Sequence, residues 1–210
     1  MLALRDVHFR YRSDTDDLLN GLSHDFAPDA VTALTGASGR GKSTLLYLLG
    51  LLLTPSAGHV VLDGQEVSAW PDAQRSALRS QRLGFVFQDA ALDPRRTVLD
   101  AVAEPALYAG WSRNEAHTRG RALLAELGLE HRADHRPAEI SGGQAQRAAV
   151  ARALITGAEV ILADEPTGNL DRANATAVLT ALRRSAASRT VVIATHDPFV
   201  IDHADHVLTL

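Results

Sequence analysis

The chain has 210 residues, a formal net charge of −4 at pH 7 and no cysteine. This length fits one domain, or one domain with a subdomain, and is sufficient to bury a core. The charge argues against non-specific nucleic-acid binding, and the lack of cysteine excludes disulfides and thiolate chemistry. The N-terminus lacks the apolar stretch of a signal peptide, and the longest apolar run, residues 45–53, is shorter than the about 20 residues that cross a bilayer. We therefore expect a protein that is soluble, or peripheral to a membrane through a partner.

Apolar runs that predict strands alternate with segments of helical periodicity at both ends of the chain. This alternation indicates an α/β core with a parallel sheet. Between the two ends, the sequence is rich in Ala, Leu, Arg and Glu and is helical in pattern, which predicts an insertion at residues 89–157. The predicted strands are residues 2–11, 31–35, 59–62, 83–87, 160–163, 190–195 and 207–210, and the predicted helices outside the insertion are residues 42–52 and 171–186.

A glycine-rich segment, G-A-S-G-R-G-K-S at residues 36–43, stands between a predicted strand and a predicted helix. This is the context in which such a segment forms a phosphate-binding loop, because its backbone N–H groups and the helix dipole converge on an anion. We expect the Lys42 amine to reach the β- and γ-phosphates and the Ser43 hydroxyl to bind Mg²⁺. The predicted nucleotide-binding segment comprises Gly36, Ala37, Ser38, Gly39, Arg40, Gly41, Lys42, Ser43 and Thr44.

Two carboxylates, Asp164 and Glu165, follow the apolar run Val160 to Ala163. Ligands bind at the carboxyl ends of strands in open α/β sheets. Asp164 is a candidate for holding Mg²⁺, and Glu165 for polarising the water that attacks the γ-phosphate. The alternative is an exposed acidic turn, which the upstream phosphate loop disfavours.

Two further polar residues end predicted strands. Gln88 follows residues 83–87, where a neutral amide can contact Mg²⁺ or the attacking water. His196 follows residues 190–195, where it can contact the γ-phosphate. Taken alone, Gln88 is typical of a surface residue and His196 of a structural histidine. Together with the phosphate loop and Glu165, they predict an enzyme that binds and hydrolyses a nucleoside triphosphate.

The segment Ser141-Gly142-Gly143-Gln144 precedes a predicted helix that begins at Gln144 and ends at Leu154. Alone, it could be an ordinary helix N-cap. Here it falls between the phosphate loop and Asp164, and with it the chain resembles the nucleotide-binding subunits of ATP-binding cassette (ABC) systems.

The resemblance implies that Ser141, Gly142, Gly143 and Gln144 act in trans. They would close over the γ-phosphate held by a second copy of the chain, in a head-to-tail homodimer that encloses two ATPs. The resemblance also places Asn169-Leu170-Asp171 in a loop that acts across the dimer, Tyr11 against the adenine and Gln88 in the loop that communicates with a membrane partner. His196 matches the switch histidine. The alternative for Tyr11 is a packing residue at a strand end.

The resemblance implies a fold as well: an α/β P-loop NTPase (RecA-like) core with a mixed sheet, an N-terminal antiparallel β part and an inserted α-helical subdomain. All of residues 1–210 would form a single ABC ATPase domain. Residues 1–88 and 158–210 would form the nucleotide-binding core, and residues 89–157 the helical subdomain that carries Ser141 to Gln144.

A finer resemblance rests on D-E-P-T-G-N-L-D at residues 164–171 and V-A-E-P-A-L-Y-A-G-W at residues 102–111. Both are similar to the branch that includes the MacB, LolD and FtsE ATPases. The branch implies a separate integral membrane permease, a location at the cytoplasmic face of the membrane, and export or force transmission for cargo such as a lipoprotein, peptide, antibiotic or haem. No nucleic acid is expected as a partner.

Two other functions stay open at this point. One is a soluble ABC ATPase of a cofactor-assembly complex, which also has a single cassette. The other is an ATPase that gates a cell-wall hydrolase through a membrane partner.

Two surface assignments complete the sequence-based expectations. Arg40 stands at a loop position that the family usually fills with a small residue. We expect its side chain to be solvated; the alternative is that it points to the dimer partner. Residues 89–110 should form part of a groove for the permease. The apolar candidates for its surface are Phe85, Leu92, Val98, Leu99 and Tyr108.

Overall fold

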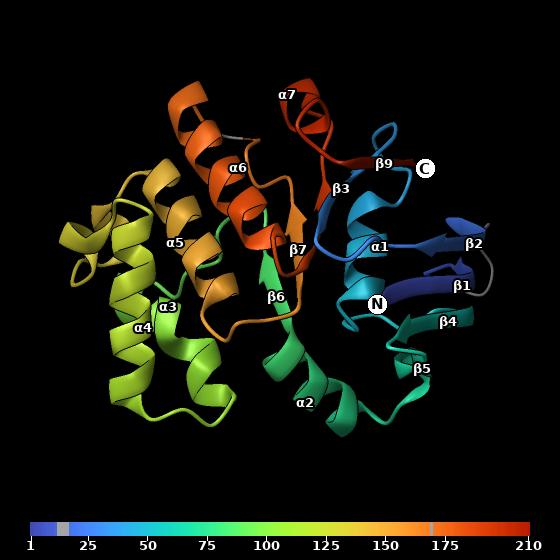
Figure 1. Cartoon of the computed structure of the whole chain (residues 1–210), viewed down its shortest axis with the longest axis horizontal. Helices are drawn as coiled ribbons and strands as arrows, with labels where there is room; N and C mark the ends of the chain where they lie inside the picture. The colour runs from blue at the N-terminus through green and yellow to red at the C-terminus, as the bar shows by residue number, and fades with distance from the viewer. Residues whose placement is uncertain (12–16, 169) are drawn as a thin grey trace.

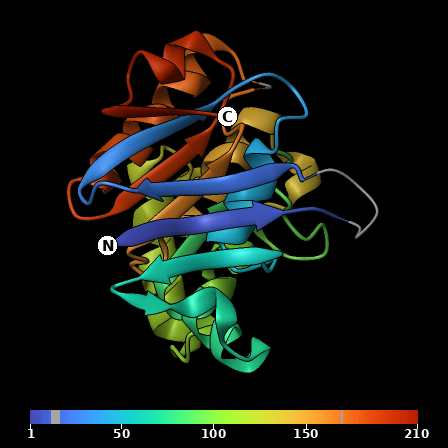
Figure 2. The same ribbon diagram turned by 90° about the vertical axis from the view of Figure 1, so that its right-hand side faces the viewer.

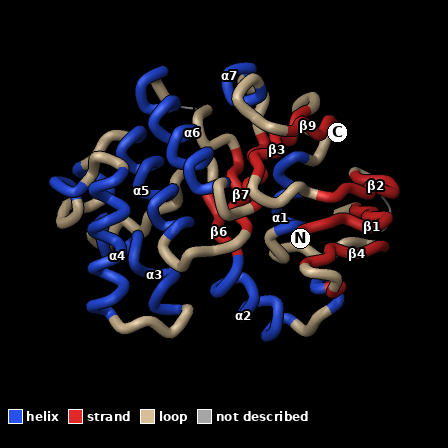
Figure 3. Tube along the Cα trace, in the orientation of Figure 1, coloured by secondary structure: helices blue, strands red, loops and turns tan. Residues whose placement is uncertain are grey.

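The structure is a computed structural model that describes residues 1–11, 17–168 and 170–210. Its strands form two separate sheets. The order is β6–β7–β8–β3–β9 in the five-stranded sheet and β2–β1–β4–β5 in the four-stranded sheet (Figures 1 and 3). The strands are β1 (Leu2–Phe9), β2 (Leu19–Asp25), β3 (Ala30–Thr35), β4 (Ala57–Leu62), β5 (Gln65–Glu66), β6 (Leu83–Val86), β7 (Val160–Asp164), β8 (Thr190–Ala194) and β9 (His206–Thr209).

Every pairing in the five-stranded sheet is parallel, and every pairing in the four-stranded sheet is antiparallel. The antiparallel strands β2, β1 and β4 lie side by side at the edge of the molecule (Figure 2). The expected α/β core and N-terminal antiparallel part are thus confirmed, with parallel and antiparallel strands segregated into the two sheets.

Helices cover both faces of the parallel sheet. Helix α1 lies between the two sheets, and α3, α4, α5 and α6 lie on the opposite side (Figure 1). The helices are α1 (Lys42–Leu49), α2 (Asp72–Arg82), α3 (Val98–Tyr108), α4 (Arg113–Glu126), α5 (Gly142–Leu154), α6 (Arg172–Ala186) and α7 (Pro198–Ile201), with short 3₁₀ turns η1 (Val67–Ala69), η2 (Glu130–Arg132) and η3 (Pro137–Glu139).

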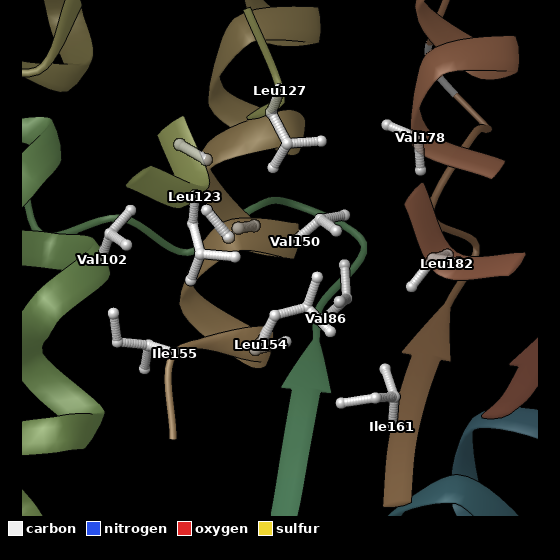
Figure 4. Packing of buried hydrophobic residues seen from close by; sticks show 14 of the residues in the cluster. Val86, Val102, Leu123, Leu127, Val150, Leu154, Ile155, Ile161, Val178 and Leu182 are labelled. Carbon is white, nitrogen blue, oxygen red and sulfur yellow. The ribbon is translucent and has the colours of Figure 1, made fainter. Parts of the chain in front are cut away.

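The core consists of two hydrophobic clusters, one on each face of the parallel sheet. Because side chains alternate along a strand, Ile161 of β7 packs with the α3–α6 side, whereas Leu162 packs with α1 and the antiparallel sheet. Figure 4 shows Ile161 beside Leu154 and below Leu182, within the cluster on the α3–α6 side. All five residues of β7 and of β8 are buried, which explains why both were recognisable as uninterrupted apolar runs.

Strands β2 and β5 and helices α2 and α7 were not predicted from the sequence, and helix α1 is shorter than predicted. Strand β2 is an edge strand of mostly polar residues, and α2 buries only Leu78, so neither carries a strong hydrophobic pattern. Helix α1 ends at Leu49, three residues before the predicted end. Gly50 caps it and the following Leu51 has φ of 56°, which is incompatible with a continuing helix.

Candidate functional site

The phosphate loop links the carboxyl end of β3 to the start of α1. Gly39 and Gly41 have φ of 79° and 93°, backbone conformations that other residues rarely adopt, so the tight turn depends on glycine. The Lys42 ammonium donates hydrogen bonds to the carbonyl oxygens of Gly36 (2.9 Å) and Ala37 (3.2 Å). The loop therefore combines a helix N-terminus with a fixed positive charge, as an anion site requires.

Ser43 and Asp164, which are 121 residues apart in the sequence, meet beside this loop. The Ser43 hydroxyl donates a hydrogen bond of 3.0 Å to Asp164 Oδ1, and Asp164 is only 4% exposed. Burial raises the pKa of Asp164 above its ordinary value, and the neighbouring Glu165 charge adds to this rise, while the bond from Ser43 opposes it. The pair presents two hard oxygen atoms, and its carboxylate is poorly solvated, so a cation would favour its ionised form.

Glu165 leaves β7 with a positive φ of 43°, an uncommon conformation for glutamate that turns the chain at the sheet edge. Its carboxylate lies 2.7 Å from His196 Nδ1 and accepts a hydrogen bond of 3.2 Å from the Thr195 hydroxyl. The Glu165 side chain is 13% exposed and that of His196 is 75% exposed. The carboxylate is thus oriented by two residues at the end of β8, and the histidine faces solvent.

These elements surround one open cleft with a volume of about 1120 Å³. The cleft is large enough for a nucleotide and brings together most of the residues singled out from the sequence. Its lining includes Tyr11, Gly36, Ala37, Ser38, Gly39, Gly41, Lys42, Ser43, Thr44, Gln88, Glu165 and His196, with Asp17 and Leu18 as additions from the structure.

Tyr11 stands at the mouth of the cleft and is 65% exposed. Its hydroxyl and the Thr44 hydroxyl are 2.9 Å apart, and its ring meets Phe9 edge-on at 5.0 Å. The ring is therefore tied to the phosphate-loop helix while much of it stays accessible to a ligand.

Helix α5 holds the segment that contains Gln88, a connection not anticipated from the sequence. The Gln146 amide donates to the Phe87 carbonyl (3.1 Å), and the Arg152 guanidinium donates to the carbonyls of Ala90 (2.7 Å) and Ala91 (2.6 Å). Gln146 is 5% exposed, and burial lowers the pKa of Arg152. Two polar residues in an alanine-rich buried helix were the available signal, because buried polar groups need partners.

The Ser141–Gln144 segment begins α5, two residues earlier than predicted, and does not line the large cleft. Ser141 and Gln144 form a reciprocal capping box, with Ser141 N–H donating to Gln144 Oε1 at 2.9 Å and Gln144 N–H donating to Ser141 Oγ at 3.3 Å. Gly142 lines a separate cavity of about 190 Å³ together with Gln88 and Glu165.

Gly143 packs against α6, where an added Cβ would lie 2.8 Å from Asn174 Cγ. Asn174 in turn bonds the N-cap Asp171 twice, through its backbone N–H (2.8 Å) and its side-chain amide (2.9 Å). The start of α5 is therefore connected to Asp171 within one chain. Asn169, which belongs to the same predicted loop, lies outside the described residues.

The two surface assignments have different outcomes. Arg40 is exposed, and its backbone N–H donates to the Ala37 carbonyl at 3.3 Å. Tyr108 is 71% exposed, but Val98 and Leu99 are 0% and 3% exposed, so their assignment to a docking surface was wrong. They lie in the first turn of α3, which packs against α4 and α5.

Comparison with known proteins identifies the family to which the chain belongs. Residues 19–168 match the ABC transporter family. The chain belongs to this family. With the phosphate loop and Glu165 on one cleft, it is an ABC ATPase: it binds ATP and hydrolyses it.

Relatives of two kinds match the whole chain. "Lipoprotein-releasing system ATP-binding protein LolD 2" of Caulobacter vibrioides is 45% identical, and the match covers 100% of this ABC ATPase and 94% of the relative. "Macrolide export ATP-binding/permease protein MacB" of Chromobacterium violaceum is 43% identical over 100% of the chain but only 33% of the relative. The chain thus spans about a third of this MacB relative. The branch expected from residues 164–171 and 102–111 is confirmed.

Solved structures of other ABC cassettes have the same fold. The dimeric post-hydrolysis state of the ATP-binding cassette MJ0796 bound to ADP and Pi superposes with a TM-score of 0.92 at 31% identity, covering 100% of this chain and 94% of that one. A second dimeric structure of MJ0796, described as a bacterial ABC transporter cassette, gives a TM-score of 0.93 at 32% identity. The P-loop NTPase fold is confirmed.

Proposed function

We propose that this ABC ATPase powers a separate integral membrane permease of the export or force-transmission type. The observation that carries the proposal is the set of full-length matches to LolD, named for lipoprotein release, and to the ATPase part of MacB, named for macrolide export. Within the described residues, no helix is long and apolar enough to cross a membrane. The permease would therefore hold the chain at the cytoplasmic face.

Within the cleft, we assign the phosphates to the loop at residues 36–44, with Lys42 at the β- and γ-phosphates and the Tyr11 ring against adenine. Glu165 would accept a proton from the attacking water. Its orientation by Thr195 and His196 supports this role, because a general base must be held in place. The exposed imidazole of His196 would contact the γ-phosphate.

The oxygen atoms beside the phosphate loop fit a magnesium ion. Ser43 and Asp164 are 3.0 Å apart, and the buried carboxylate of Asp164 lacks full solvation. We infer that these two residues hold Mg²⁺, with Gln88 as a third contact. The ion, when bound, supplies charge neutralisation on the phosphates.

We infer further that two copies of the chain complete each other's sites. Ser141, Gly142, Gly143, Gln144 and Asp171 would act on the nucleotide bound by the second copy. The exclusion of Ser141, Gly143 and Gln144 from both cavities that Glu165 lines supports this assignment, as do the dimeric MJ0796 structures. Residues 89–157 would form the helical subdomain and residues 1–88 and 158–210 the nucleotide-binding core.

The test is to purify tagged Glu165→Gln protein from detergent-solubilised native membranes with ATP and Mg²⁺ and to identify its partners. A stoichiometric integral membrane protein is expected, and its extracytoplasmic domain would indicate whether cargo is moved or a cell-wall hydrolase is gated. A purely soluble assembly complex would contradict the proposal and favour a role in cofactor assembly.

A further inference from the structure

A cation–π contact links the start of α6 to α7, which follows the turn that carries His196. The Arg172 guanidinium carbon lies 3.4 Å from the centre of the Phe199 ring. Arg172 is the first residue of α6, directly after Asp171, and Phe199 is the second residue of α7, three residues after His196. The Phe199 ring also packs edge-on against His203, with the ring centres 4.5 Å apart.

From Phe199, a series of hydrogen bonds leads back to Glu165. Phe199 N–H donates to Asp197 Oδ1 (2.9 Å), and Asp197 N–H donates to the Thr195 hydroxyl (3.0 Å). That hydroxyl donates to Glu165 Oε2 at 3.2 Å. The turn that carries Thr195, His196 and Asp197 is thus positioned at one end by Phe199 and contacts Glu165 at the other.

From Arg172, a second path leads to the N-terminus of α5. The adjacent Asp171 caps α6 and is bonded by Asn174, on which Gly143 packs. The Arg172–Phe199 contact therefore joins two parts of the chain. One is the N-terminus of α6, beside the residues proposed to act on the second copy's nucleotide, and the other is the turn that carries His196. A displacement of the α6 N-terminus must either move Phe199 or break this contact.

We propose that Arg172 and Phe199 are positioning residues that transmit closure of the dimer, felt at Asp171, to the His196 turn and so to the Glu165 carboxylate. The proposal rests on the function proposed above and adds a specific route between the two composite sites. Neither residue lines the cleft, so neither should contribute to binding of ATP. The alternative is that the Arg172–Phe199 contact stabilises the fold without affecting turnover.

The test compares Arg172→Gln, Arg172→Lys, Phe199→Leu and the double variant Arg172→Gln/Phe199→Leu in the full chain. Loss of a cation–π contact predicts that kcat for ATP hydrolysis falls about threefold to tenfold in Arg172→Gln and Phe199→Leu. KM for ATP should stay at the wild-type value. The double variant should match the single variants, because the two substitutions remove the same interaction. Arg172→Lys should recover most of the lost activity because it keeps the cation.

A second readout follows the His196 turn directly. The imidazole resonances of His196 in NMR spectra should shift in the same direction in Arg172→Gln and Phe199→Leu. Arg184→Gln, at an exposed arginine near the other end of α6, is the matched control and should leave kcat and these resonances unchanged.

Three outcomes would overturn the proposal: wild-type kcat in both single variants, effects that multiply in the double variant, or a change in KM alone. Failure of the proposed function is distinguishable, since wild-type protein would then hydrolyse ATP but recover no integral membrane partner. A wild-type chain that turns over ATP beside unaffected variants refutes only the positioning role.

Discussion

Asp164 and Glu165 are neighbours in sequence, yet the fold gives their carboxylates different surroundings. Asp164 is the last residue of β7, 4% exposed and bonded to Ser43, whereas Glu165 turns away through its positive φ toward Thr195 and His196. Adjacent acids with separate partners can divide metal binding and water activation between them.

For Asp164 we predict a stability effect that depends on pH. Its pKa in the folded chain is raised above 3.8, so the folded state holds this proton more tightly than the unfolded state does. Stability from this group is present at low pH and is lost as pH rises through the raised pKa. Asp164→Asn should therefore melt at a higher temperature than wild type at pH 7 without nucleotide and Mg²⁺, and the difference should shrink toward pH 4.

Thermal melting of both proteins between pH 4 and pH 8 checks this prediction. The same variant should gain less stability than wild type when Mg²⁺ is added with ATP, because one ligand oxygen is lost. An Asp164→Asn protein that melts below wild type at pH 7 would show that the buried carboxylate is already compensated.

For Glu165 we predict that Glu165→Gln binds ATP, accumulates as a closed dimer and loses turnover. An amide keeps the shape of the side chain but cannot accept a proton, so kcat should fall by at least about 100-fold. Steady-state hydrolysis and size-exclusion chromatography with ATP and Mg²⁺ measure the two effects. Glu130→Gln, at an exposed position in η2, is the control and should behave as wild type; normal hydrolysis by Glu165→Gln would assign the water to another residue.

At the scale of elements, α5 has contacts in two directions. Its interior residues Gln146 and Arg152 hold the backbone on either side of Gln88, and its N-terminal turn packs on α6 through Gly143. A rigid helix with both sets of contacts moves the Gln88 segment and the Ser141 end together.

The two glycines at the start of α5 provide a matched pair of variants. Gly143→Ala brings a methyl group to 2.8 Å from Asn174 Cγ, whereas nothing lies within 4 Å of a methyl group at Gly142. Gly143→Ala should lower the free energy of unfolding by about 1 kcal/mol through overpacking. Gly142→Ala should leave it equal or slightly higher, since alanine is the better helix former.

Chemical denaturation of the nucleotide-free chains measures both free energies of unfolding. Equal destabilisation by the two substitutions would mean that the spacing between α5 and α6 does not limit the residue at position 143.

At the scale of the whole molecule, the proposed exchange of residues between two copies can be tested by mixing. Lys42→Ala disables the phosphate loop, and Ser141→Arg disables the segment that would act in trans. Each variant alone should be inactive. In a mixed dimer, the intact loop of one chain meets the intact Ser141 segment of the other, so an equimolar mixture should recover about a quarter of wild-type activity if pairing is random.

ATP hydrolysis by each variant and by the mixture is the measurement. A mixture as inactive as its components would place Ser141 and Lys42 at the same site within one chain, against the proposed dimer. Unmixed wild-type protein at the same total concentration is the reference.

Local pattern sufficed where a residue's role depends on its immediate neighbours in sequence. The phosphate loop needs only glycines and a helix start, and the buried strands β7 and β8 are recognisable in the sequence as apolar runs. Strand β2 and helix α2, whose sequences are mostly polar, were harder to predict, because they are stabilised by pairing and packing with other segments. The burial of Val98 and Leu99 had the same origin: their environment depends on α4 and α5, which come later in the chain.

The sequence by itself indicated the chemistry. Lys42, Ser43, Asp164 and Glu165 are its candidate reactive set, since these residue types at these spacings are sufficient to mark the phosphate loop and the acidic strand end, and the Ser141–Gln144 segment carries the resemblance to ABC ATPases. Only the tertiary structure decided how the parts are connected. The bond between Ser43 and Asp164, the hold of Arg152 on the Gln88 segment and the stacking of Arg172 on Phe199 join residues far apart in the chain. Such contacts leave no periodic signal, because they arise from how strands and helices pack.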